Sequence, residues 1–148
     1  KQDFLPALAI ICIVLTAHYN NNFKESRVYI DYVPAQEKFA MIMHNKSDNP
    51  TLLNYNSLDG GFYTAADIIP NVRYFIKWNI SDSAFPDNIE SQKLAMKNKE
   101  VEFVVIRRSS SAERDATAEL VENYDLIASQ RQYFAGIDFT YDLYEVKR

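Results

Sequence analysis

The residues best suited to binding chemistry lie around the Gly60-Gly61 pair. Asp59 directly precedes the two glycines, and Asn56 and Tyr63 lie a few positions to either side. Carboxylate and amide groups can hydrogen-bond to hydroxyls, and an aromatic ring can cover the apolar face of a sugar. These five residues therefore predict a saccharide-binding surface. The alternative is that Asp59 only initiates a turn by accepting nearby backbone N–H bonds, a common role of aspartate.

The sequence contains few residues or motifs that would indicate catalysis or metal binding. The sequence contains no G-x-S-x-G elbow, no P-loop and no H-E-x-x-H motif. His18 and His44 are far apart in the chain, and the single Cys12 lies within an apolar run. We therefore predict no metal site, no cofactor and no catalytic residue.

A second possible binding feature is a pair of arginines followed by serines. Arg107 and Arg108 end an apolar run, and the serines at 109–111 come directly after them. A helix that begins there could bind an anion through its free N–H groups. The alternative is an ordinary helix cap beside two solvated arginines.

Composition limits the class of protein. The chain has 148 residues, of which 47% are apolar and 24% charged, enough for one folded domain with its own core. Acidic residues outnumber basic ones by 20 to 16, and the formal net charge is −4. Nucleic-acid binders generally carry the opposite balance, so we predict no nucleic-acid partner.

The N-terminal part contains an uncharged apolar run from Phe4 to Ala17, interrupted only by Pro6 and Thr16. As a helix it would be about 21 Å long, shorter than the roughly 30 Å core of a bilayer. We interpret residues 1–19 as the end of a transmembrane helix. Alternatives are the apolar region of a signal peptide and a buried core element. Lys1 before the run favours an extracytoplasmic location for residues 20–148.

Beyond the run, an asparagine-rich linker over 20–33 leads into a region where helices and strands alternate. Periodicity predicts helices over about 34–44 and 89–99, and another after a capping box at Ser110 with Ala116, Leu120 and Tyr124 on its buried side. Strands are expected over 51–55, 101–106, 124–129 and 139–147. This order predicts a small layered α/β domain over 34–148. Its sheet should be mixed, with the last two strands antiparallel.

The layout resembles the C-terminal extracytoplasmic region of bacterial polytopic membrane glycosyltransferases that use polyprenyl-phosphate sugars. The resemblance covers nearly all 148 residues in layout, from the apolar run through the linker to the final strand. It is carried by Tyr32–Lys38, Leu58–Tyr63, Tyr74-Phe75 and Tyr141–Lys147.

The resemblance implies that the parent protein transfers a sugar onto a cell-envelope acceptor. Catalytic carboxylates of such enzymes lie in loops between earlier membrane helices, outside these 148 residues. It therefore implies a non-catalytic extracytoplasmic domain of the cell membrane, with the membrane and a glycan or other envelope acceptor as partners. Two alternatives remain: a secreted or surface-anchored binding module, and a soluble α/β enzyme with a buried N-terminal element.

Overall fold

A computed structural model of the chain describes residues 4–19, 33–110, 117–134 and 137–148. The chain divides into two units, residues 1–33 and 34–148. Every residue of the two hydrophobic clusters belongs to 34–148, so that region has a core of its own.

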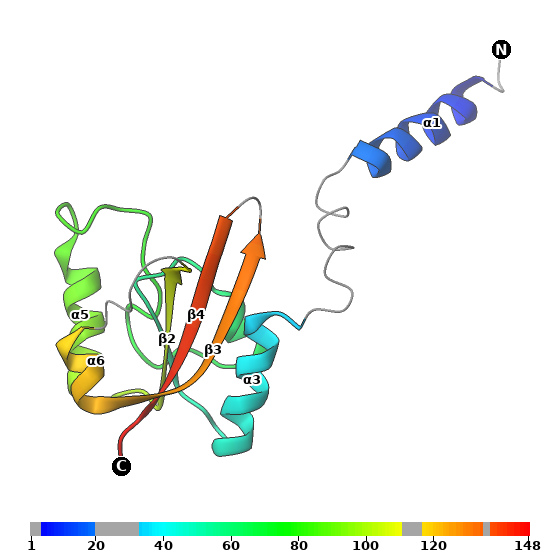
Figure 1. The fold of residues 1–148 in the computed structure, drawn as a ribbon. Helices are drawn as coiled ribbons and strands as arrows, with labels where there is room; N and C mark the ends of the chain where they lie inside the picture. The colour runs from blue at the N-terminus through cyan, green and yellow to red at the C-terminus, as the bar shows by residue number, and fades with distance from the viewer. Residues whose placement is uncertain (1–3, 20–32, 111–116, 135–136) are drawn as a thin grey trace. The chain divides into compact units, whose positions relative to one another are not determined.

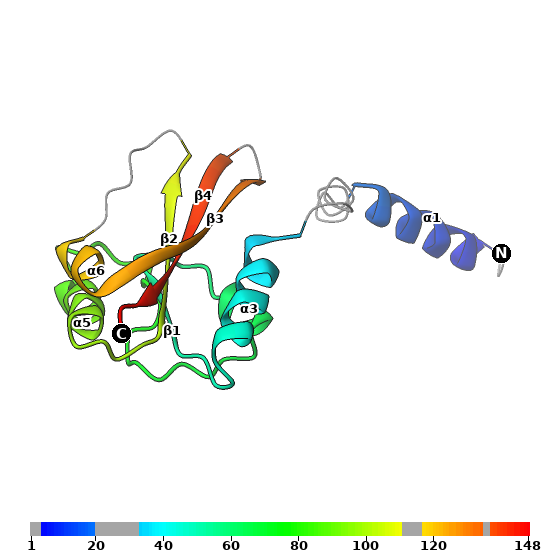
Figure 2. The ribbon, with the colours of Figure 1, turned by 60° about the horizontal axis from the view of Figure 1, so that its bottom comes forward.

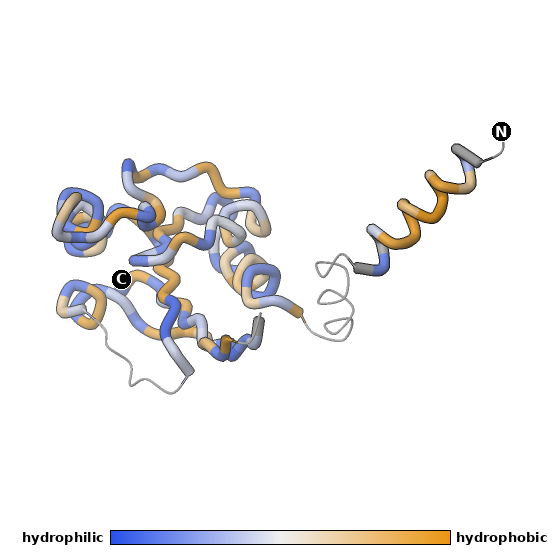
Figure 3. Tube along the Cα trace, turned by 90° about the horizontal axis from the view of Figure 1, so that it is seen from above, coloured by the Kyte–Doolittle hydropathy of each residue, from blue (hydrophilic) through white to orange (hydrophobic). Residues whose placement is uncertain are grey.

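The first unit contains α1 (Phe4–Tyr19), a helix of 16 residues that Figure 3 shows to be apolar along most of its length. Its described side chains are exposed, including those of Ile10, Ile13 and Cys12. A helix of this length measures about 24 Å. Across the described ranges, no helix combines the length and the apolarity that a membrane crossing requires. The apolar helix is therefore present, but its interpretation as transmembrane is not supported by the structure.

The second unit is built on a four-stranded mixed sheet (Figure 2). Its strands are β1 (Leu52–Tyr55), β2 (Phe103–Ser109), β3 (Tyr124–Phe134) and β4 (Ile137–Val146). They lie in the order β1-β2-β4-β3, with β1 parallel to β2 and the other two pairs antiparallel. The predicted mixed sheet and the antiparallel pairing of the last two strands are confirmed.

Helices cover both faces of this sheet (Figure 1). On one face, α3 (Ala35–Lys46) and α4 (Gly61–Ala65) supply Phe39, Met43 and Phe62 to a first core cluster. On the other, α5 (Pro86–Lys97) and α6 (Ala118–Asn123) supply Met96 and Leu120 to a second cluster. The unit is therefore a layered α/β domain.

Neighbouring residues in β1 and β2 enter opposite clusters. Leu52 and Val105 belong to the first cluster, whereas Leu53 and Val104 belong to the second. Successive side chains of a strand point to opposite faces, so strands covered on both sides need continuous apolar runs. This is why β1 and the start of β2 stand out in the sequence.

The helix expected after Ser110, with Leu120 on its buried side, is shorter in the part that the structure describes. Helix α6 begins at Ala118, and its cap is Thr117, whose side chain accepts from the Leu120 N–H. The hydroxyl of Ser110 instead donates to Asp138 at 2.9 Å. The rest of the proposed capping box, Glu113, lies outside the described residues. Tyr124, expected both on the buried side of this helix and as the start of the strand over 124–129, is the first residue of β3, so the predicted strand start is confirmed.

Candidate functional site

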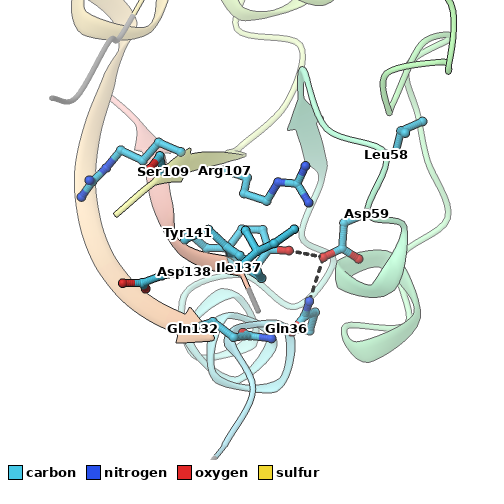
Figure 4. A pocket seen from close by; sticks show the side chains of 11 residues that line it. Gln36, Leu58, Asp59, Arg107, Ser109, Gln132, Ile137, Asp138 and Tyr141 are labelled. Atoms are coloured by element: carbon cyan, nitrogen blue, oxygen red, sulfur yellow. Dashed lines mark hydrogen bonds between the residues drawn. The ribbon is translucent and has the colours of Figure 1, made fainter. Parts of the chain in front are cut away.

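A pocket of about 720 Å³ lies where β2, β3 and β4 meet the start of α3 and the loop before α4 (Figure 4). Strand β1 pairs with β2 only as far as Ile106, whereas β4 continues beside β2 to Ser109. The end of β2 is therefore paired on one side only, and its side chains contribute to the pocket. The lining residues are Gln36, Leu58, Asp59, Arg107, Arg108, Ser109, Gln132, Ile137, Asp138, Phe139 and Tyr141.

Asp59 is held in place by hydrogen bonds from four elements of the fold, α4, α3, β4 and β1. One carboxylate oxygen accepts from the Gly61 N–H at 2.9 Å. The other accepts from Gln36 Nε2 at 2.8 Å and from the hydroxyl of Tyr141. Its backbone carbonyl accepts from the side-chain amide of Asn54. Asp59 is thus both the turn former of the alternative interpretation and part of the pocket wall.

Tyr141, a residue of β4, connects Asp59 to the sheet. Its side chain is buried, and its ring makes an edge contact with Phe139 at a centroid distance of 5.2 Å. Burial raises the pKa of the Tyr141 hydroxyl, and the hydrogen bond to Asp59 and the negative charge there raise it further. Nearby Arg107 acts in the opposite direction. Tyr141 therefore stays protonated and donates to the carboxylate.

Arg107 lies opposite Tyr141 in the β2–β4 pairing. Its guanidinium carbon is 5.6 Å from the ring centroid of Phe139, a cation–π contact. Figure 4 shows the side chain directed to the same side of the sheet as the Tyr141 hydroxyl and Asp59. Arg107 is exposed, and within the described residues it has no ion-pair partner.

The next arginine, Arg108, also lines the pocket, but it projects from the other face of β2. Arg108 pairs with the buried carboxylate of Asp142 at 2.8 Å, and Asp142 also accepts from Ser129. Adjacent strand residues alternate between faces, so two consecutive arginines have different roles.

Asp138, the second carboxylate of the pocket lining, is also paired. It accepts hydrogen bonds from Arg131 and Ser110. These bonds hold the pKa of Asp138 below its ordinary value.

The structure separates the five residues predicted to bind a saccharide. Of these, only Asp59 lines the pocket. Gly61 begins α4 beside it, where an added Cβ would lie 3.0 Å from Asp59 Oδ1, whereas a Cβ on Gly60 would meet nothing within 4 Å. Asn56 is exposed outside the lining, and its N–H donates to Gln92 Oε1 at 3.0 Å.

Tyr63 is a core residue. Its hydroxyl lies 2.9 Å from the carbonyl oxygen of Leu52 and 2.8 Å from that of Phe75, and it accepts from the Asn54 N–H. Burial raises the pKa of this hydroxyl. Tyr63 ties α4 to β1 and to the segment beside β1, and it does not face the pocket.

Several lining residues were not identified from the sequence. Gln36 and Gln132 come from α3 and β3, and both are polar residues in regular elements, with no local motif to mark them. The alternation of aromatic and polar residues in β4 places Phe139 and Tyr141 on one face and could have indicated them. Arg107 drew attention for an anion site at a helix start, but the residues that would begin that helix, 111–116, lie outside the described residues.

Neither histidine contributes to a metal centre in the described part of the chain, where no three His, Cys, Asp or Glu side chains gather. The ring Nε2 of His44 lies 2.8 Å from the carbonyl oxygen of Ala66. His44 therefore connects α3 to the residue directly after α4.

No protein-family model, curated protein or solved structure matches this chain.

Proposed function

We propose that residues 34–148 form a non-catalytic, extracytoplasmic saccharide-binding domain, held at the membrane by α1. In this proposal the domain belongs to a glycosyltransferase-like membrane protein that acts on cell-envelope glycans. The observation that carries the proposal is the contrast between a domain with its own core and pocket and a separate helix whose apolar side chains are exposed.

The side chains of α1 support attachment to a membrane. Leu8, Ile10, Ile13 and Val14 are all exposed, and the helix has no polar stripe along it. Exposed apolar area of this extent is unfavourable in water, at about 25 cal/mol per Å². Lipid or other membrane helices would cover it. Because α1 is shorter than a bilayer core, the proposal makes it the end of a membrane helix.

The pocket supports binding more than acid–base catalysis. Both oxygens of Asp59 already accept hydrogen bonds from the fold. Asp138 is paired with Arg131, and its lowered pKa makes it a poor proton donor near neutral pH. The lining also combines amides, a hydroxyl and aromatic rings, which suits a sugar.

Vesicle flotation tests the membrane attachment. The full chain, reconstituted from detergent into vesicles of phosphatidylcholine and phosphatidylglycerol, should float with the lipid. Replacing Ile10 and Ile13 by lysine should leave the chain in the bottom fraction, because each lysine costs about 2.5–3.5 kcal/mol in the apolar region.

A matched control replaces two exposed apolar residues of the domain, Ile69 and Val121, by lysine. This variant should float as the unmodified chain does. Failure of the unmodified chain to float, or flotation of the Ile10→Lys/Ile13→Lys variant, would contradict the attachment.

A further inference from the structure

Arg107 is the positively charged residue of the pocket lining that has no ion-pair partner among the described residues. Asp59 is engaged by three donors, Arg108 by Asp142, and Asp138 by Arg131. Arg107 lies over the ring of Phe139 and interacts with the hydroxyl of Tyr141. It pairs with no carboxylate among the described residues. A guanidinium has five N–H donors and is always charged, so most of its donors are available to a ligand.

Two side-chain amides that line the same pocket each have one polar atom engaged in a hydrogen bond and one without a described partner. Gln36 Nε2 donates to Asp59, and Gln132 Oε1 accepts from the Ala35 N–H. The described contacts leave Gln36 Oε1 as an acceptor and Gln132 Nε2 as a donor. Such a pair suits ligand hydroxyls, each of which can both donate and accept.

The rest of the lining favours one negative charge on the ligand over two. A planar carboxylate matches the fork of a guanidinium and can form two parallel hydrogen bonds with it. A phosphate dianion would find no second cation in the lining without an ion pair, because Arg108 is paired with Asp142, and it would meet the carboxylate of Asp59 there. The apolar side chains of Ile137 and Phe139 offer a surface for the face of a ring.

We propose that this pocket binds a carboxylated sugar, such as a uronic acid unit of a glycan, with Arg107 binding the carboxylate and Gln36 and Gln132 binding hydroxyls. The inference rests on the proposed saccharide-binding function and names its ligand class. The pocket volume falls within the range of about 300–1,000 Å³ of pockets for small ligands.

Calorimetric titration of the full chain in detergent micelles tests the proposal with three probes. Trigalacturonic acid carries the carboxylates, its trimethyl ester has the same rings without the charges, and glucose 6-phosphate carries a phosphate. Trigalacturonic acid should bind, and the ester should bind about tenfold to a hundredfold more weakly, because a hydrogen-bonded charge is lost.

The matched variants are Arg107→Gln and Arg73→Gln. Both remove one positive charge, and both arginines are exposed and lie over an aromatic ring, Arg73 over Tyr74 at 5.0 Å. Arg107→Gln should weaken the binding of trigalacturonic acid by the same factor by which esterification weakens binding to the unmodified chain. Arg73→Gln should bind as the unmodified chain does.

Equal binding of trigalacturonic acid and its ester would overturn the role of Arg107 and leave saccharide binding intact. Tighter binding of glucose 6-phosphate than of trigalacturonic acid would overturn the preference for a carboxylate. Absence of binding by all three probes would overturn both this inference and the saccharide-binding part of the proposed function. The ester comparison uses the unmodified chain, so it holds whatever the stability of the variants.

Discussion

The hydroxyl of Tyr141, in the middle of β4, donates a hydrogen bond to the carboxylate of Asp59, 82 residues earlier in the chain. This contact fixes the loop before α4 against the sheet and sets one wall of the pocket. A hydrogen bond to a carboxylate is stronger than one between neutral groups. The arrangement therefore couples the shape of the site to the stability of the domain.

Replacing Tyr141 by phenylalanine should lower the free energy of unfolding by about 1–3 kcal/mol, because a partly buried carboxylate loses one donor while the ring packing is kept. Urea denaturation of the full chain in detergent measures this change. Tyr133→Phe, on an exposed tyrosine of β3, is the control and should change stability by less. Equal midpoints for Tyr141→Phe and the unmodified chain would show that the contact does not hold the loop.

The two adjacent glycines should respond differently to alanine. At Gly61 the new Cβ would lie 3.0 Å from Asp59 Oδ1 and 3.3 Å from Gln36 Cγ, and Asp59 cannot easily move because three donors hold it. We expect Gly61→Ala to cost about 1–3 kcal/mol of stability. Gly60 has φ −77° and open space, so Gly60→Ala should be nearly neutral. Thermal unfolding of both variants checks the difference, and a Gly60→Ala loss as large as that of Gly61→Ala would refute it.

The ion pair between Asp138 and Arg131 predicts an acid-side dependence of stability. The pKa of Asp138 is lowered in the folded state from its ordinary 3.8. Its contribution is therefore fully present above that value and disappears as pH falls through the lower folded pKa. Melting temperatures from pH 6 to pH 2 should fall less steeply for Asp138→Asn than for the unmodified chain. Asp48→Asn, on an exposed residue, should reproduce the unmodified curve, and an identical slope for Asp138→Asn would contradict this account.

Most of the domain's elements could be predicted from the sequence because their signals are local. Apolar continuity marks β1 and the start of β2, and the spacing of Phe39 and Met43 marks α3. Helix α4 was not predicted, since five residues are too few to show a period. β3 extends five residues beyond its predicted end at Ser129, to Phe134, because pairing with β4 continues through the polar residues 130–132, which carry no strand pattern.

Of the residues predicted to bind a saccharide, only Asp59 belongs to the pocket lining. Its partners Gln36 and Tyr141 lie far from it in the sequence, and only the folded sheet brings them together. Tyr63 was expected to bind ligand because it is near Asp59 in the chain, but the turn of α4 directs it into the core. Nearness along the chain thus identified the loop and not the side chains that face the pocket.

The measurement that tests the central claim most directly is amide chemical-shift mapping of trigalacturonic acid on the full chain in micelles. Shifts concentrated at Gln36, Asp59, Arg107 and Phe139 are the result that a saccharide-binding pocket predicts. Shifts confined to residues outside the pocket lining, such as Tyr74, Trp78 and Phe85, whose rings contact one another, or no shifts at millimolar ligand, would contradict it.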